Sequence, residues 1–126
     1  MESLKSLTEK IGCLIDEKLG EDIVILDLRG ISSIADYFVI ATGNSDRQVV
    51  AIANHIDDEL AKLGIFSKFK EGIRTGRWVV LDYRDILVHI FHKDERYYYN
   101  LERLWSDAKK LELMVDSHSA IHYNNA

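Results

Sequence analysis

Two stretches decide the fold of this chain: residues 36–49, DYFVIATGNSDRQV, and residues 78–92, WVVLDYRDILVHIFH. Each contains β-branched and aromatic residues, which favour strands, and each is interrupted by a polar turn. Neither carries a recognisable phosphate, metal or nucleophile motif. The pattern is typical of a compact domain that binds a partner through its surface, and not of an enzyme with a catalytic pocket.

The first stretch predicts a strand over residues 37–42 that leads directly into a helix. Ser45 followed by Gln48 fits a capping box, in which the serine oxygen accepts the Gln48 amide and the glutamine side chain reaches back. The second stretch predicts a hairpin with strands over residues 78–82 and 86–91. Together they place a strand–helix junction and a hairpin in one sheet.

The rest of the chain supplies helices and further strands. Apolar residues recur every three or four positions over residues 3–19 and 46–62, which predicts two amphipathic helices. Residues 22–28 are apolar on both sides and indicate a central strand. The remaining expected elements are an edge strand over residues 65–70, a mobile loop over 71–76, and a last helix capped by Asp94 with Tyr97, Leu101, Leu104, Trp105 and Ala108 on one side.

The predicted order is α-β-β-α-β-β-β-α. It indicates the α/β (α+β) class, with one mixed sheet of about five strands flanked by helices. A length of 126 residues suits one domain, expected over residues 1–113. Residues 114–126 are polar and aperiodic, so we expect a disordered tail.

Composition narrows the cellular setting and the partners. The lone Cys13 cannot form an internal disulfide, and the N-terminus has no apolar signal region, so we expect a cytoplasmic protein. No apolar run approaches the ~20 residues that span a bilayer, so no membrane is expected. The net charge of −5 weakens naked nucleic acid as the main partner and favours a basic protein surface.

The turn Gly43-Asn44-Ser45 offers an enzymatic alternative. It joins a strand to a helix N-terminus, where free amides can bind an anion, and it resembles the Gly-Ser turn of nucleotidyltransferases. Those enzymes hold magnesium with Asp-x-Asp on a neighbouring strand, and residues 65–70 contain no acid. A turn plus a helix cap is therefore favoured. The alternative, a magnesium-dependent nucleotidyltransferase-like enzyme, would need two carboxylates near this turn, from among Asp27, Asp36, Asp82 and Asp85.

The histidines do not predict a metal site. His89 and His92 are three residues apart on a strand and therefore face opposite sides of the sheet. His118 and His122 have helical ligand spacing but lie in the expected tail. We predict no catalytic residue, no cofactor and no metal ligand.

The hairpin offers the best candidate surface. In its first strand Trp78, Val80 and Asp82 share one face, and Val79 and Leu81 share the other with the Tyr83 that follows. One face must pack against the helices. The other is either further core or an exposed surface that presents tryptophan beside an acid, a combination typical of protein interfaces.

The chain resembles the ribosomal silencing factor family, also called Iojap-like proteins. The matching segments are residues 32–45, Arg47, 71–72, 78–83, Asp85, 88–91 and 101–105. The resemblance implies a nucleotidyltransferase-like fold without catalysis. It also implies binding to the fourteenth protein of the large ribosomal subunit, with possible contact to ribosomal RNA. Family members thereby block subunit joining and lower translation when nutrients are short.

By this resemblance the partner-binding residues are expected to be Trp78, Leu81, Asp82, Tyr83, Asp85 and His89. The chain departs from the family at Arg84, where glycine is usual and where a positive φ is therefore expected. Either the turn is rebuilt or it carries strain. A homodimer formed by the apolar faces of the first and last helices is a further possibility.

Overall fold

The computed structural model describes residues 3–99, 103, 108–115 and 121–125. Its elements, in chain order, are α1 (Leu4–Glu17), β1 (Glu21–Asp27), β2 (Tyr37–Gly43), α2 (Asp46–Ala61), β3 (Phe69–Glu71), β4 (Trp78–Asp82), β5 (Ile86–His92), α3 (Lys93–Tyr99), β6 (Lys109–Val115) and β7 (Ile121–Asn125).

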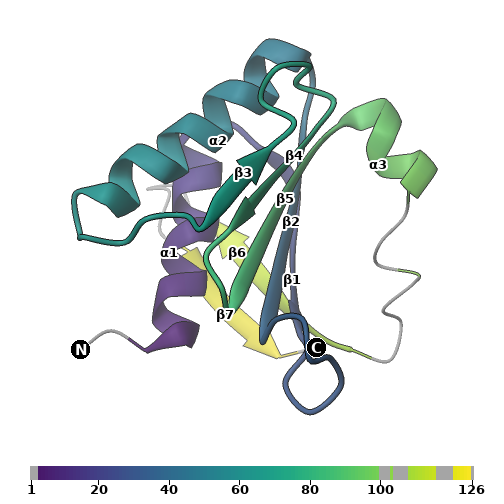
Figure 1. Cartoon of the computed structure of the whole chain (residues 1–126). Helices are drawn as coiled ribbons and strands as arrows, with labels where there is room; N and C mark the ends of the chain where they lie inside the picture. The colour runs from purple at the N-terminus through teal and green to yellow at the C-terminus, as the bar shows by residue number, and fades with distance from the viewer. Residues whose placement is uncertain (1–2, 100–102, 104–107, 116–120, 126) are drawn as a thin grey trace.

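The described strands form one mixed sheet in the order β3-β4-β5-β2-β1-β6-β7. The pair β2–β5 is parallel and every other pair is antiparallel. α1 and α2 cover one face of the sheet, and α3 lies on the opposite side (Figure 1). The predicted mixed sheet flanked by helices is confirmed.

The main core lies between the sheet and the pair α1–α2. Ile11 and Ile15 of α1 and Ile52 and Ile56 of α2 are fully buried there, as their helical spacing predicts. Every residue of β2 is buried, because this central strand is covered on both sides. The side of α1 that carries Ile11 and Ile15 therefore packs into the core of the single chain.

Ser45 and Gln48 connect the start of α2 to the end of α1. Ser45 Oγ accepts the Gln48 amide at 3.1 Å, as predicted. The Gln48 side chain does not return to the Ser45 amide. Its Oε1 accepts the amide of Asn44 at 2.6 Å, and its Nε2 donates to the carbonyls of Lys18 and Leu19. The glutamine thus joins the end of α1 to the start of α2, an arrangement that local pattern alone does not reveal.

Two expected elements differ at their boundaries. The edge strand is only β3, shorter than the predicted 65–70, although the Lys68 amide still donates to the Asp82 carbonyl at 2.6 Å. α3 begins at Lys93 rather than after a cap at Asp94. The Asp94 amide donates instead to His92 Nδ1 at 3.2 Å, because β5 runs straight into the helix.

The sheet has two strands more than the sequence predicted. β6 pairs with the free edge of β1, and β7 pairs with β6, where we expected the end of a helix and a disordered tail. Ala108 is buried on the α3 side, whereas Leu101, Leu104 and Trp105 lie outside the described residues. The domain boundary at residue 113 stays a prediction.

Candidate functional site

The hairpin β4–β5 separates its side chains cleanly. Val79 and Leu81 are fully buried toward the helices. Trp78, Val80 and Asp82 point to the other side and are half-buried. The question left open by the sequence is thus answered: the tryptophan face is the more exposed of the two.

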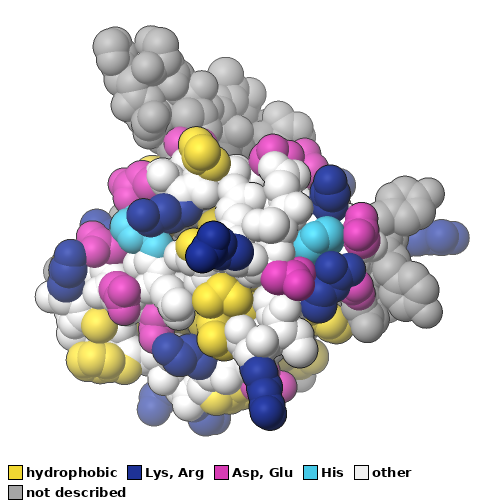
Figure 2. Space-filling view, turned by 90° about the horizontal axis from the view of Figure 1, so that it is seen from above, with side chains coloured by type: hydrophobic (Ala, Val, Ile, Leu, Met, Phe, Trp, Pro, Cys, Tyr) yellow, Lys and Arg dark blue, Asp and Glu magenta, His cyan; other side chains and the backbone are white. Residues whose placement is uncertain are grey.

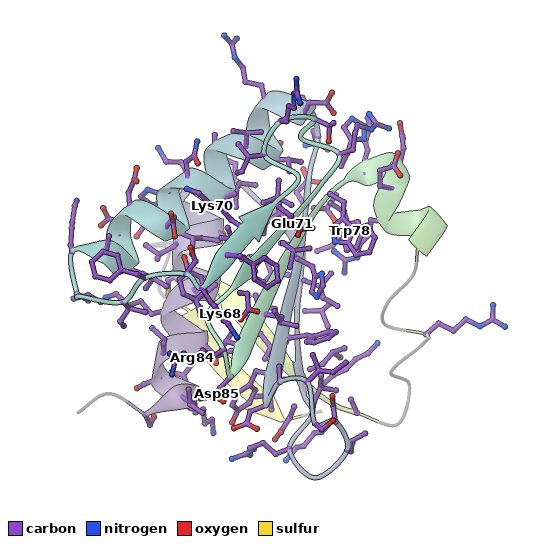
Figure 3. The ribbon with its side chains drawn as sticks, in the orientation of Figure 1. Lys68, Lys70, Glu71, Trp78, Arg84 and Asp85 are labelled. Carbon is purple, nitrogen blue, oxygen red and sulfur yellow. The ribbon has the colours of Figure 1, made fainter. Side chains whose placement is uncertain are left out.

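The exposed side of the hairpin continues onto its neighbours. Asp82 lies opposite Phe69 and Leu87, and Val80 lies opposite Glu71, so all of these side chains share one side of the sheet. Figure 3 shows Glu71 and Trp78 pointing away from α2, whereas Lys70 points toward it. We call this surface the open face; its members are Phe69, Glu71, Trp78, Val80, Asp82 and Leu87.

Trp78 is held at the border of the open face. Its ring stacks on Phe91 with centroids 4.8 Å apart, and its Nε1–H donates to His89 Nδ1 at 3.2 Å. Trp78 is thus neither plain core nor a freely rotating surface residue. His89 itself is buried, with 6% of its surface exposed, so it cannot make a broad contact with a partner.

The opposite side of the hairpin is bound to α2 by a hydrogen bond and an ion pair to Asp57. Tyr83 Oη donates to Asp57 Oδ1, and Lys70 Nζ pairs with Asp57 Oδ2, both at 2.9 Å. Burial would raise the pKa of the Asp57 carboxyl, but these hydrogen bonds outweigh it and lower that pKa. Burial, with the bond to Asp57, raises the pKa of Tyr83 well above its ordinary value. Leu81 and Tyr83 therefore support the surface from beneath.

The turn that follows β4 is strained. Arg84 has a φ of +74°, and the Asp85 amide donates to the Tyr83 carbonyl at 3.0 Å, which gives the turn the hydrogen bond and φ of a γ-turn. The Arg84 amide donates to Asp82 Oδ1 at 2.7 Å. The turn is not rebuilt around the arginine, and the strain is carried. Figure 3 shows Arg84 and Asp85 at this tip, where both are exposed.

Replacing Arg84 by glycine should raise the free energy of unfolding by about 1 kcal/mol. Glycine adopts a positive φ without the steric cost that a Cβ imposes, and this gain exceeds its extra entropy loss on folding. Urea unfolding followed by circular dichroism measures the change. The matched control is Arg84→Ala, which removes the same charge but keeps the Cβ. An equal gain in both variants would contradict the backbone explanation.

The structure separates the groups that the enzymatic alternative requires. Gly43 ends β2, whereas Asp27, Asp36, Asp82 and Asp85 all lie around the strand's beginning, where Tyr37 pairs with Asp27 and with Ile86. A seven-residue strand is roughly 20 Å long. None of the four acids can therefore share a metal ion at the turn.

The Gly43 end of the sheet is also occupied by internal contacts. The Asn44 side chain donates to Glu21 Oε1 at 2.9 Å, and Arg77 pairs with Asp46 and Glu95. Figure 2 views this end and shows basic and acidic side chains intermingled. Within the described ranges no group of three or more potential ligands could hold a metal ion. His118 lies outside those ranges, and the His122 side chain is not described.

Comparison with known proteins identifies the family. The family model described as "Ribosomal silencing factor during starvation" matches residues 1–125. The chain belongs to the ribosomal silencing factor family. Its role is therefore that of a ribosomal silencing factor, as the resemblance implied.

The relatives extend from bacteria to chloroplasts. The ribosomal silencing factor RsfS of Bacillus subtilis is 51% identical over 109 residues, covering 86% of this chain and 92% of the relative. The chloroplastic protein Iojap of Zea mays is 35% identical over 76% of this chain and 42% of its own length.

A solved structure supports the fold. A crystal structure of a Chromobacterium violaceum protein superposes with a TM-score of 0.80 at 32% identity, covering 82% of this chain and 87% of the other. Among the described residues, no helix is long and apolar enough to cross a membrane. The family segment at residues 101–105, apart from Arg103, lies outside the described part.

Proposed function

We propose that the chain binds the large ribosomal subunit through the open face and thereby keeps the small subunit from joining. The expected contact is the fourteenth protein of the large subunit, as the family resemblance implies. The observation that carries this proposal is the half-exposed Trp78, held by Phe91 and His89 at the border of an apolar surface. Aromatic side chains of this kind are the usual anchors of protein interfaces.

Charge at the rim of the open face fits a basic partner. Glu71 and Asp85 are exposed, and Asp82 is half-exposed opposite the apolar Phe69 and Leu87. Their carboxylates would attract lysine and arginine on a ribosomal protein, and this attraction should weaken as salt screens it.

The six residues singled out from the sequence then fall into two groups. Trp78, Asp82 and Asp85 reach the surface and are proposed as contacts. The other three, Leu81, Tyr83 and His89, are buried and are proposed to support those contacts.

The proposed action is steric and needs no reaction. A rigid domain bound to the face of the large subunit that meets the small subunit would exclude the latter for as long as it stays bound. An interface of ordinary size buries about 1,600 Å² in total. The degree of inhibition is then set by affinity and concentration.

Trp78→Ala should weaken binding to isolated large subunits by about 2 kcal/mol, roughly 30-fold in the dissociation constant. Co-sedimentation with large subunits over a range of protein concentrations measures this loss. A parallel gradient with both subunits should show more joined ribosomes with the variant than with the native protein.

The control is Leu63→Ala, which removes a half-exposed apolar side chain just after α2, on the helix-covered side. It should leave co-sedimentation unchanged. Native binding by the Trp78 variant would remove this residue from the interface. Failure of the native protein to hinder subunit joining at saturation would refute the proposed function.

A further inference from the structure

We infer that His89 is a positioning residue for the docking anchor: its imidazole accepts the Trp78 indole hydrogen and fixes the ring at the open face. This inference rests on the proposed function for its consequence, but its geometry belongs to the free protein. The nitrogen–nitrogen distance is 3.2 Å, and the two ring centroids are 6.0 Å apart.

The imidazole is itself fixed by aromatic neighbours from two strands. Phe38 of β2 lies 4.7 Å away between ring centroids, and Phe91 of β5 lies 6.2 Å away, nearly parallel. These rings leave His89 little room to rotate. An acceptor that is rigid in this way can define the orientation of its donor.

The hydrogen bond determines the tautomer of His89. Since Nδ1 accepts, it carries no proton, and a neutral ring must then hold its proton on Nε2. Burial lowers the pKa of His89 to about 4, so the neutral ring is the form present at pH 7. Nε2 is buried and has no hydrogen-bond partner in the described part of the chain.

The unpaired Nε2–H of His89 indicates that this residue positions Trp78 rather than simply stabilising the core. Leaving a buried N–H group without an acceptor disfavours the folded state, so an apolar residue of similar size would suit the core equally well or better. What the native histidine adds over an apolar residue is a hydrogen bond, accepted from Trp78. The contribution of that contact is to hold the indole in one orientation, which reduces the entropy lost when a partner binds.

Three substitutions of His89 distinguish the contribution of Nδ1 from that of Nε2. His89→Leu removes both. His89→Asn keeps an oxygen acceptor close to the place of Nδ1, whereas His89→Gln places its polar atoms near the place of Nε2. If positioning is the role, large-subunit affinity should fall about tenfold in the leucine and glutamine variants. It should recover to within about threefold of native in the asparagine variant.

The full-length protein also gives direct spectroscopic readouts. In ¹⁵N spectra at pH 7, His89 should show a protonated Nε2 and an unprotonated Nδ1. The Trp78 indole N–H should exchange slowly with water in the native protein and His89→Asn, and fast in His89→Leu. Urea unfolding should show that His89→Leu is no less stable than the native protein.

The outcomes are decisive even if a variant fails to fold. An Nδ1-protonated tautomer in the native protein overturns the inference, as does native affinity in a folded His89→Leu. Loss of affinity in proportion to lost stability, without recovery in His89→Asn, also overturns it. If the native protein itself does not bind large subunits, the proposed function fails, while the tautomer and indole exchange still decide whether His89 fixes Trp78.

Discussion

Gly72→Ala should lower the free energy of unfolding by about 3 kcal/mol, because two costs coincide at this position. Gly72 has a φ of +87°, which disfavours any residue with a Cβ. An added Cβ would also overlap the carbonyl oxygen of Trp78, a backbone atom that cannot move aside without displacing β4. Urea or thermal unfolding measures the loss, and the disturbed Trp78 should also weaken ribosome binding.

The control is Gly64→Ala. Gly64 has a similar φ of +77°, but an added Cβ there meets nothing within 4 Å. This variant should lose only the conformational part, about 1 kcal/mol. Equal losses in the two variants would show that the overlap of the added Cβ with the Trp78 carbonyl oxygen has no effect on stability.

Lowering the pH from 7 to 4 should reduce the free energy of unfolding by roughly 3 kcal/mol through His89 alone. Burial lowers the pKa of His89 from 6.5 to about 4 in the folded protein, while the unfolded chain keeps the ordinary value. Between these values the unfolded state binds more protons. The stability contribution is therefore fully present above pH 6.5 and is lost as the pH falls to 4.

His89→Asn isolates this effect, because asparagine does not titrate. Unfolding free energies measured in urea at several pH values should show a shallower slope between pH 6.5 and 4 in the variant. The carboxyls of Asp27, Asp57 and Glu59 also have lowered pKa values, so their stabilising effect is lost as the pH falls, but this loss is common to both proteins and cancels from the comparison. Identical slopes in both proteins would mean that folding does not lower the pKa of His89.

The hairpin shows how far local pattern reaches. Alternation along residues 78–82 correctly divided the strand into two faces, since successive side chains in a strand point to opposite sides. It could not tell which face is covered, because that depends on α2 packing over Val79 and Leu81. The family resemblance placed Leu81 and Tyr83 among the expected contacts, and burial of both side chains was likewise beyond what local pattern reveals.

The corrections elsewhere have the same origin. Gln48 was expected to complete a local capping box, but its side-chain oxygen accepts the Asn44 amide and its side-chain nitrogen donates to carbonyls at the end of α1, about thirty residues away in sequence. β6 was missed because residues 109–115 alternate too weakly, and their strand conformation depends on the edge that β1 offers. Arg84 is the opposite case. The glycine that the family usually has at this position correctly indicated a positive φ, although this chain has arginine there.

The amino-acid pattern was enough to predict two amphipathic helices, a capped helix start and a hairpin with a strained turn, all of which depend on short-range interactions, and to recognise the family signature. Tertiary packing was needed to establish which side of the hairpin stays open and that His89 accepts a hydrogen bond from Trp78. The reason is that periodicity and turn preferences act between neighbours in the chain. Burial and the pairing of polar groups depend on which distant segments meet.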